Sequence, residues 1–306
     1  GCGCGEAGPS GCDNTCGSTL ENDECGVCGG DNDCITPITQ DNIHAAVDLW
    51  FSDPVSAEST YGHISNWEVG SIQNMQNLFK DRGEFTDDIS QWDVSSVTSM
   101  NYLFRNTNFN GDLSGWDVSS VTNMGYMFDN NETFSGDISS WDVSSVTIMG
   151  NMFWGAESFN SDLSSWDVSN VTNMTNLFML TYNFNSDLSS WDVSNVTNMT
   201  NTFRQSAFNS DISSWDVSKV TNFSTMFWGN TNFNQDISSW DVTLANNFSN
   251  MFDGASALSN INKCAINTSF SSNSNWPYDW SENEDCAGTC GLAIVDCAGE
   301  CGGSAV

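Results

Sequence analysis

The sequence predicts a repeat solenoid of eight rungs, in which short parallel β-strands alternate with short helical turns, flanked by small disulfide-rich segments. Two observations lead to this fold class. A unit of 24 or 25 residues recurs eight times along the middle of the 306-residue chain, and no cysteine lies between residues 35 and 263. One such unit is too short to bury its own apolar residues, so each must pack on its neighbours, as repeats of a solenoid do.

A tryptophan marks each repeat. The repeat tryptophans are Trp67, Trp92, Trp116, Trp141, Trp166, Trp191, Trp215 and Trp240. Within the unit from residue 141 to 165 the apolar positions are Trp141, Val143, Val146, Met149, Met152, Phe153, Phe159 and Leu163. Nearly every copy keeps the same positions apolar, so we expect the eight tryptophans to form one interior column.

Each repeat has two candidate elements. The stretch Leu/Ile-Ser-x-Trp-Asp-Val is typical of a strand, which we expect to pair in parallel with the next rung at ~4.8 Å. The following Val-Thr-Asn-Met-x-x-Met-Phe has apolar residues three and four apart, which favours a short helix or a 3₁₀ turn. The sequence therefore predicts a strand and a helical turn on opposite sides of every rung.

Polar residues mark the predicted corners of the coil. Two Asp-x-Ser triplets occur in each rung, for example Asp112 with Ser114 and Asp117 with Ser119. Asp readily accepts a hydrogen bond from the backbone two residues later, so we interpret these triplets as Asx turns. A second column, expected to bond buried backbone groups of the neighbouring rung, consists of Asn110, Asn160, Asn185, Asn209 and Asn234.

The same aspartates are the candidate general acids of a polysaccharide-cleaving enzyme. Because they recur in every rung rather than forming one unusual cluster, we favour the turn interpretation. The two histidines, His44 and His63, have no repeated Ser or Cys partner in the sequence. We therefore predict that the protein is not an enzyme and has no catalytic residues or cofactor.

A helical cap is predicted before the repeats. Thr39 or Asp41 is the expected N-cap of a helix that runs to about Phe51, and Asp53 with Pro54 begins a shorter one that Gly62 ends. The expected domains are a Cys-rich segment (1–34), the helical cap (35–66), the solenoid (67–264), a C-terminal cap or linker (265–285) and the start of a second Cys-rich segment (286–306).

The cysteines gather at the two ends of the chain. They are Cys2, Cys4, Cys12, Cys16, Cys25, Cys28 and Cys34, then Cys264, Cys286, Cys290, Cys297 and Cys301. Short Cys-rich segments usually depend on disulfides formed in an oxidising compartment, so we predict a secreted protein. Zinc is the alternative, because Cys25-Gly-Val-Cys28 has metal-ligand spacing. A Cys264–Cys286 bond is a plausible local pair, but spacing does not determine the connectivity.

The balance of charge limits the partners. The net charge is −33, with six Lys and Arg against 39 Asp and Glu. Phosphates need cationic groups, so nucleic acid and anionic membrane surfaces are excluded as partners. No apolar run approaches the ~20 residues that cross a bilayer. Calcium is the one metal that the acidic residues favour, either bridging successive carboxylates within an aspartate column or at Asp23, Asp31 and Asp33.

The position thirteen residues after each tryptophan varies while its surroundings stay nearly constant. This variable column consists of Lys80, Arg105, Asp129, Trp154, Met179, Arg204, Trp228 and Asp253. Trp154 and Trp228 lie outside the core positions, and exposed aromatic residues bind sugars or neighbouring proteins. They are our candidate interface residues, with folding back onto their own loop as the alternative.

Eight Asn-x-Ser/Thr sequences are candidate N-glycosylation sites, and most follow from the repeat consensus. Asn131, in a variable loop, and Asn267, beyond the last rung, are the favoured two. The other six are Asn170, Asn173, Asn195, Asn198, Asn222 and Asn247.

The signature Asp-Ile/Leu-Ser-x-Trp-Asp-Val-Ser-x-Val-Thr-x-Met-x-x-Met-Phe resembles the BspA-like leucine-rich-repeat surface proteins over about residues 61–264. The stretch from Asp41 to Pro54 is similar to the helical segment that often precedes such repeats. The resemblance implies a right-handed, leucine-rich-repeat-like solenoid on a cell surface, without catalytic residues. The Cys-rich ends resemble short Cys/Gly repeats of large extracellular proteins from microbes and protists.

Two functions follow from these expectations. The first is a structural building block of an extracellular fibre, appendage or coat, whose partners are other copies or neighbouring modules of one longer precursor. The Gly/Cys pattern interrupted at Gly1 and Val306 favours this function. The alternative is an adhesin whose solenoid binds a glycan or a host surface protein, which Trp154 and Trp228 favour.

Overall fold

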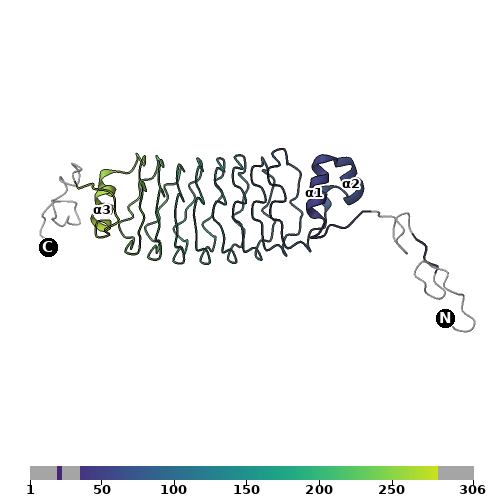
Figure 1. Ribbon diagram of the computed structural model, residues 1–306, viewed down its shortest axis with the longest axis horizontal. Helices are drawn as coiled ribbons and strands as arrows, with labels where there is room; N and C mark the ends of the chain where they lie inside the picture. Colours follow the sequence, from purple (N-terminus) through teal and green to yellow (C-terminus); the bar gives the residue numbers. More distant parts are fainter. Residues whose placement is uncertain (1–18, 23–34, 282–306) are drawn as a thin grey trace, which may run out of the picture. The chain divides into compact units, whose positions relative to one another are not determined.

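The computed structural model describes residues 19–22 and 35–281, and it divides the chain into two compact units between Glu68 and Val69. The first unit contains α1 (Ile43–Ser52), α2 (Pro54–Tyr61) and the 3₁₀ helix η1 (Ile64–Asn66). The second contains the stacked repeats and α3 (Asn260–Phe270), as Figure 1 shows.

The helices of the first unit follow the sequence signals except at the start of α1. α2 begins as predicted, because the Asp53 carboxylate accepts the Ser56 N–H at 3.2 Å and Pro54 takes the first turn. It ends at Gly62, whose φ of 73° favours glycine. The N-cap of α1 is instead Asn42, whose side chain makes no capping hydrogen bond to the helix. The prediction of Thr39 or Asp41 at this position is therefore wrong.

Trp67, the first repeat tryptophan, belongs to this unit. Its indole Nε1 donates a hydrogen bond to the Gly62 carbonyl at 3.0 Å, and its ring meets Trp50 edge-on at 6.2 Å. The residue is 4% exposed. It is thus a core residue of the helical unit.

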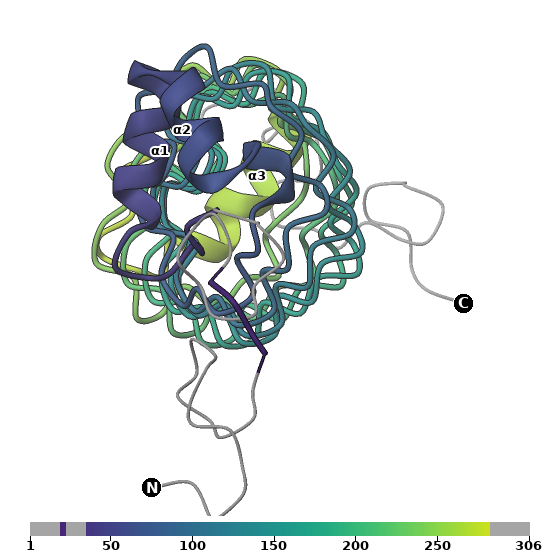
Figure 2. The ribbon, with the colours of Figure 1, turned by 90° about the vertical axis from the view of Figure 1, so that its right-hand side faces the viewer.

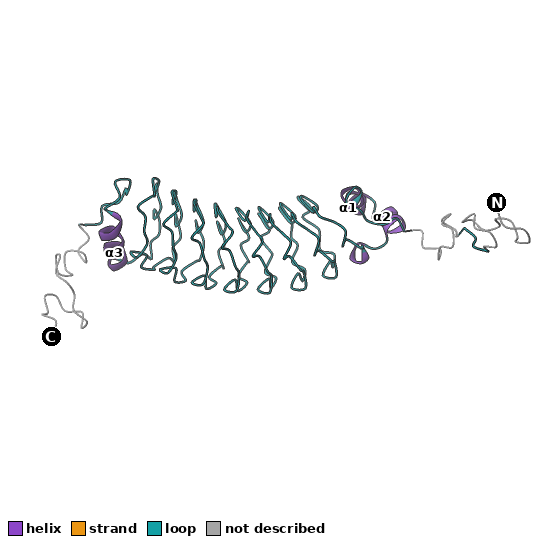
Figure 3. Cartoon of the chain, turned by 90° about the horizontal axis from the view of Figure 1, so that it is seen from below, coloured by secondary structure: helices purple, strands orange, loops and turns teal. Residues whose placement is uncertain are grey.

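In the second unit, successive repeats stack on one another as rungs, each named here by its tryptophan. Figure 2, seen along the stack, shows the rungs superimposed around a common outline. Figures 1 and 3 both show α3 beside the last rung. The seven tryptophans from Trp92 to Trp240 are buried, as the interior column predicts.

The prediction of a β-solenoid is wrong. In the described ranges, 19–22 and 35–281, no residue belongs to a β-strand, and neighbouring rungs share only isolated parallel bridges such as Asn74 with Ser99 (Figure 3). The bridges fall in the Val-Thr-x-Met stretch, at the start of the segment predicted as a short helix or 3₁₀ turn. No helix forms there, and Met-x-x-Met is a single turn in which, for example, Leu78 N–H bonds the Met75 carbonyl. The predicted strand is instead a corner, because the Trp92 N–H bonds the Ile89 carbonyl three residues earlier.

The backbone conformation explains why the rungs are not strands. Two positions in every rung, ten and fourteen residues after the tryptophan, have positive φ, for example 62° at both Asn77 and Asp81. A strand needs successive residues with negative φ, so each of these positions interrupts one. Successive backbone N–H groups then point in different directions, some within the rung and some toward the next rung. Leu78 N–H bonds Met75 within the rung, whereas Asn77 N–H bonds the Asn101 carbonyl of the next rung at 3.0 Å.

Two columns of phenylalanine fill the interior. Phe153 stacks on Phe159 of its own rung with ring centroids 4.0 Å apart, and on Phe128 and Phe178 of the neighbouring rungs at 5.8 and 5.7 Å. The same stacking continues from Phe79 to Phe252. Large aromatic side chains bury much apolar surface, so this double column contributes to holding the stack together.

The one-residue difference between 24- and 25-residue rungs lies in the loop before the second phenylalanine. The 24-residue rungs begin this loop with Thr107 or Ser206, whose hydroxyl accepts the N–H two residues later. In two 25-residue rungs, Asn131 and Asn230 accept the N–H three residues later, at 3.1 and 3.0 Å. All four side chains are buried. In these four rungs the reach of the buried side chain matches the length of the loop, whereas the 25-residue Trp166 rung has the buried Thr181 at the same position.

Candidate functional site

Two columns of aspartate run along the stack, four residues before and one residue after each tryptophan from Trp92 to Trp240. Ser139 N–H donates to the Asp137 carboxylate at 2.9 Å, and Ser144 N–H donates to Asp142 at 3.0 Å. The same bond occurs in the other rungs, which confirms the Asx turns. Hydrogen bonds from the Ser139 side chain and backbone lower the pKa of Asp137. These carboxylates are therefore exposed, ionised corner groups.

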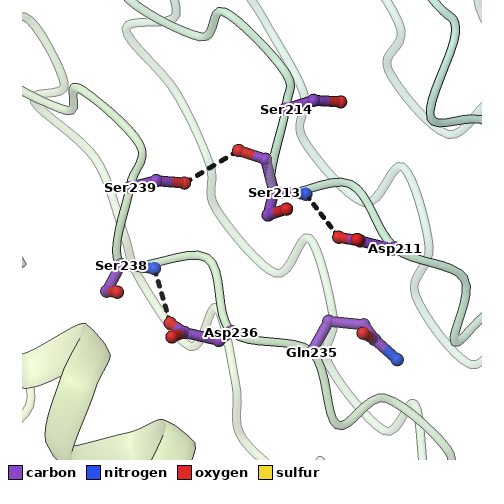
Figure 4. Close-up of a pocket in the computed structure, with 7 residues that line it drawn as sticks. All are labelled: Asp211, Ser213, Ser214, Gln235, Asp236, Ser238 and Ser239. Carbon is purple, nitrogen blue, oxygen red and sulfur yellow. Dashed lines mark hydrogen bonds between the residues drawn. The ribbon is translucent and has the colours of Figure 1, made fainter. Parts of the chain in front are cut away.

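A shallow polar pocket of about 380 Å³ lies on the first of these columns, between the last two rungs (Figure 4). Its lining residues are Asp211, Ser213, Ser214, Gln235, Asp236, Ser238 and Ser239. Asp211 and Asp236 each bond a backbone N–H, and the Ser239 hydroxyl donates to the Ser213 carbonyl at 2.8 Å. The pocket therefore offers hydroxyl and carboxylate groups to a polar molecule, without an aromatic platform.

The asparagine ladder also forms, on the surface rather than in the interior. Asn185 N–H donates to the Asn160 side-chain oxygen at 2.9 Å, and Asn209 N–H donates to Asn185 at 2.7 Å. Asn110, Asn160, Asn185 and Asn234 are exposed, and Asn209 is half-buried. The ladder joins neighbouring rungs, as expected. The backbone groups that it bonds lie at the surface, whereas we expected them to be buried.

Residues of the variable column contact residues of the same column in neighbouring rungs. Arg105 Nε lies 2.8 Å from an oxygen of Asp129, whose side chain is fully buried. Burial raises the pKa of Asp129 to about 6, against the opposing effect of Arg105. The Arg204 guanidinium lies 4.5 Å from the centre of a Trp228 ring. Trp154 and Trp228 are both half-buried, so this column carries polar pairs and partly exposed aromatic rings together.

A tyrosine pair beside this column was not predicted. Tyr102 and Tyr126 stack with ring centroids 4.4 Å apart, and Lys80 and Arg105 lie 5.6 and 5.5 Å from the Tyr102 ring. The signal was present in the sequence, since both tyrosines occupy the same position, ten residues after a tryptophan. It was missed because that position was not recognised as a surface column.

The histidines sit in the first unit. His63 accepts a hydrogen bond from Ser65 N–H at 3.3 Å at the start of η1, and its ring meets Trp50 edge-on at 5.0 Å. His44 is exposed on α1. The contacts of His63 are those of a helix cap and a packed aromatic ring.

The eight glycosylation candidates occupy different environments. Asn131 is fully buried, and its Nδ2 donates to Thr107 and to the Phe109 carbonyl, so a glycan on this nitrogen is incompatible with the fold. Asn267 is half-buried on α3 and accepts the Trp276 indole N–H at 2.9 Å. Asn170, Asn173 and Asn195 are exposed, and Asn198, Asn222 and Asn247 are half-buried.

Among the described residues there is one cysteine, Cys264, and it is disulfide-bonded. The other eleven cysteines and the calcium candidates Asp23, Asp31 and Asp33 lie outside the described residues. Within the described ranges, no three His, Cys, Asp or Glu side chains are grouped so as to hold a metal ion. The calcium and zinc hypotheses for the ends therefore stay predictions.

One sequence family matches the chain. It is described as "Mycoplasma protein of unknown function, DUF285", and it matches residues 51–164, 105–207 and 187–278. No curated protein and no solved structure is significantly similar. Of the helices in the part of the chain that the structure describes, none is both long and apolar enough to pass through a lipid bilayer.

Proposed function

The chain belongs to the DUF285 family, and we propose that it is a structural building block of an extracellular fibre, appendage or surface coat, one module of a longer secreted protein. Its partners are other copies or neighbouring modules, joined through the Cys-rich segments. The resemblance of the repeats to BspA-like surface proteins supports a place at the cell surface. No catalytic residue and no cofactor belong to this function.

The observation that carries the proposal is the use of polar groups to hold rungs together. Three kinds of side chain reinforce the backbone bonds between rungs. The Trp141 indole donates to the Leu113 carbonyl at 3.0 Å, the Ser165 hydroxyl to the Ser139 carbonyl at 2.8 Å, and the Asn160 side chain accepts from the next rung. A repeated unit whose polar groups bond its neighbours resists bending and unfolding, as a structural element requires.

Electron microscopy of the native material, with and without a reducing agent, tests the proposal. We expect linear arrays that separate into single polypeptide chains when disulfides are reduced, because covalent links between chains would lie in the Cys-rich segments. A sample alkylated without prior reduction is the control, and it should keep the arrays. Single tethered molecules under both conditions would contradict a structural role.

A cell-surface adhesin is the second candidate, and one observation favours it. Trp154 and Trp228 remain partly exposed in a column that other rungs fill mainly with charged residues. Such rings supply contact area for a glycan or a surface protein. Binding of the full chain to immobilised glycans, with Trp154→Ser/Trp228→Ser as the comparison, distinguishes the adhesin from a purely structural module.

A further inference from the structure

Most backbone hydrogen bonds between rungs run in one direction, and a smaller set, such as Thr98 N–H to the Gln73 carbonyl, runs the opposite way. In the Trp215 rung, the N–H groups of Phe223, Thr225, Phe227 and Gly229 all donate to carbonyls of the Trp240 rung, at 2.8–2.9 Å. The same positions donate forward in the earlier rungs. The last rung must therefore present N–H groups toward its C-terminal side, where no further rung follows. A bare edge of this kind pairs with any matching row of carbonyls.

By the same polarity, the first rung of the stack presents carbonyls in the opposite direction. A donor edge and an acceptor edge are complementary, so uncovered stacks of this sequence add to one another end to end. Such a contact is heterologous and does not close, and it produces open filaments of unlimited length. A protein with this backbone needs a cover on at least one edge if its stack is to have a fixed length.

The described residues after the last rung form such a cover. The Tyr278 hydroxyl accepts the Phe252 N–H at 2.9 Å and donates to the Asp253 carboxylate at 2.9 Å. A phenol suits this position because it both accepts and donates. The Asn273 side chain donates to the carbonyls of Val242 and Ala245, both at 2.8 Å. The Tyr278 hydroxyl thus accepts the hydrogen bond that Phe252 N–H would otherwise donate to a ninth rung, and Asn273 ties the segment to the last rung.

The cover also closes the apolar interior. Phe270, on α3, is fully buried against Phe248 of the last rung. Trp276 meets both Phe248 and Phe252 edge-on, at 5.3 and 6.3 Å. In the interior these phenylalanines stack face to face on the next rung, so edge-on aromatic rings end the column rather than continue it.

We infer that residues 259–280 are a terminal stop, which prevents the first rung of a second copy from adding to the donor edge. The stop fixes the number of rungs at this end, and modules then join only through other parts of the chain. This inference does not depend on the proposed function, because an adhesin and a structural module would both need it.

Trp276→Ser/Tyr278→Ser in the full chain tests the stop. We expect this variant to associate end to end, with an average mass at least about twofold that of the parent and rising with concentration. The matched control is Ile261→Ser, which changes a 69% exposed residue of α3 and should keep the parent's mass. Light scattering after gel filtration measures the mass, and electron microscopy shows whether the contacts are end to end.

Hydrogen exchange of amides in the Trp141 and Trp166 rungs reports whether the rungs stay folded in the variant. A variant with protected inner rungs and the parent's mass would overturn the inference. Lost protection in these rungs would also overturn it, since residues 259–280 would then be required for folding rather than for stopping growth. End-to-end growth of the parent under the same conditions would equally show that the edge is open.

Discussion

The indole Nε1 of Trp141 donates a hydrogen bond to the carbonyl of Leu113, 28 residues earlier and one rung back, at 3.0 Å. The side chain is 3% exposed, and its ring stacks on Trp166 at 6.4 Å. The same indole-to-carbonyl bond recurs at Trp116, Trp166, Trp191, Trp215 and Trp240. Each tryptophan thus fills the core of one rung and satisfies a buried carbonyl of the preceding one.

Trp141→Ala should lower the free energy of unfolding by about 3–5 kcal/mol, because it leaves a cavity in a middle rung. Trp141→Phe keeps part of the apolar volume but removes one of the two hydrogen bonds that the Leu113 carbonyl accepts, leaving the Trp116 N–H, which costs about 0.5–1.5 kcal/mol. Trp154→Ala, at a half-buried site, is the control and should cost less than Trp141→Ala. Denaturant unfolding measures all three, and an unchanged midpoint for Trp141→Ala would contradict the interior column.

Asp129→Asn should change how stability depends on pH. The pKa of Asp129 is raised from 3.8 to about 6, so the folded chain binds more protons than the unfolded chain between these values. Its contribution to stability therefore falls as pH rises through this window, by on the order of 2–3 kcal/mol. The variant lacks this loss, so its stability relative to the parent should rise between pH 4 and pH 6.

Asp137→Asn is the matched opposite case. Hydrogen bonds from Ser139 lower the pKa of Asp137 below 3.8, so its contribution is present above that value and is lost as pH falls through the lower pKa. The variant should be less stable than the parent at neutral pH, and the difference should shrink in acid. Thermal unfolding at a series of pH values measures the stability of both variants relative to the parent. The same pH dependence for the two variants would contradict the opposite pKa shifts of Asp129 and Asp137.

Trp154→Ser/Trp228→Ser should reduce assembly or glycan binding while leaving the melting temperature nearly unchanged, because both rings lie outside the core columns. Tyr182→Ser, at a 48% exposed residue, is the control for loss of an unrelated surface aromatic side chain. Assembly is followed by light scattering and binding by surface plasmon resonance. Intact assembly and binding in the double variant would show that the column is ordinary surface.

The cysteines should be mostly oxidised, with at least one disulfide at each end that leads outside residues 1–306. Seven cysteines precede the repeats and five lie at or after their end, so pairing within each group leaves one thiol over. Mass spectrometry of non-reduced peptides from the native material locates the bonds. Six bonds wholly within these residues would end this hypothesis.

The repeat, its core columns and its corners were predictable because each leaves a periodic mark. Trp141, Phe153 and Asp137 recur at fixed intervals, and periodic apolar and turn-forming residues indicate packing and corners directly. The strand predicted over Leu/Ile-Ser-x-Trp-Asp-Val is wrong because this stretch turns a corner, as the bond from Trp92 N–H to the Ile89 carbonyl shows. The bridged stretch is not a strand either, and the positive φ that interrupts it at residues such as Tyr102 and Leu180 leaves no signal when glycine or asparagine is absent. The Arg105–Asp129 pair was missed because it joins residues of neighbouring rungs, and the buried role of Asn131 was hidden by its glycosylation motif.

In four rungs the length of the loop matches the buried residue that begins it, and this match bears on how the length of a repeat can change. Tandem repeats gain and lose whole copies by recombination, and errors at the junctions add or remove single codons. Here a codon lost from this loop is compatible with Thr or Ser, as at Thr107 and Ser206, and a codon gained is compatible with Asn, as at Asn131 and Asn230. Thr181 begins the loop of a 25-residue rung, so the longer loop tolerates threonine as well. A change of one residue in this loop therefore leaves the core columns of the later rungs in register.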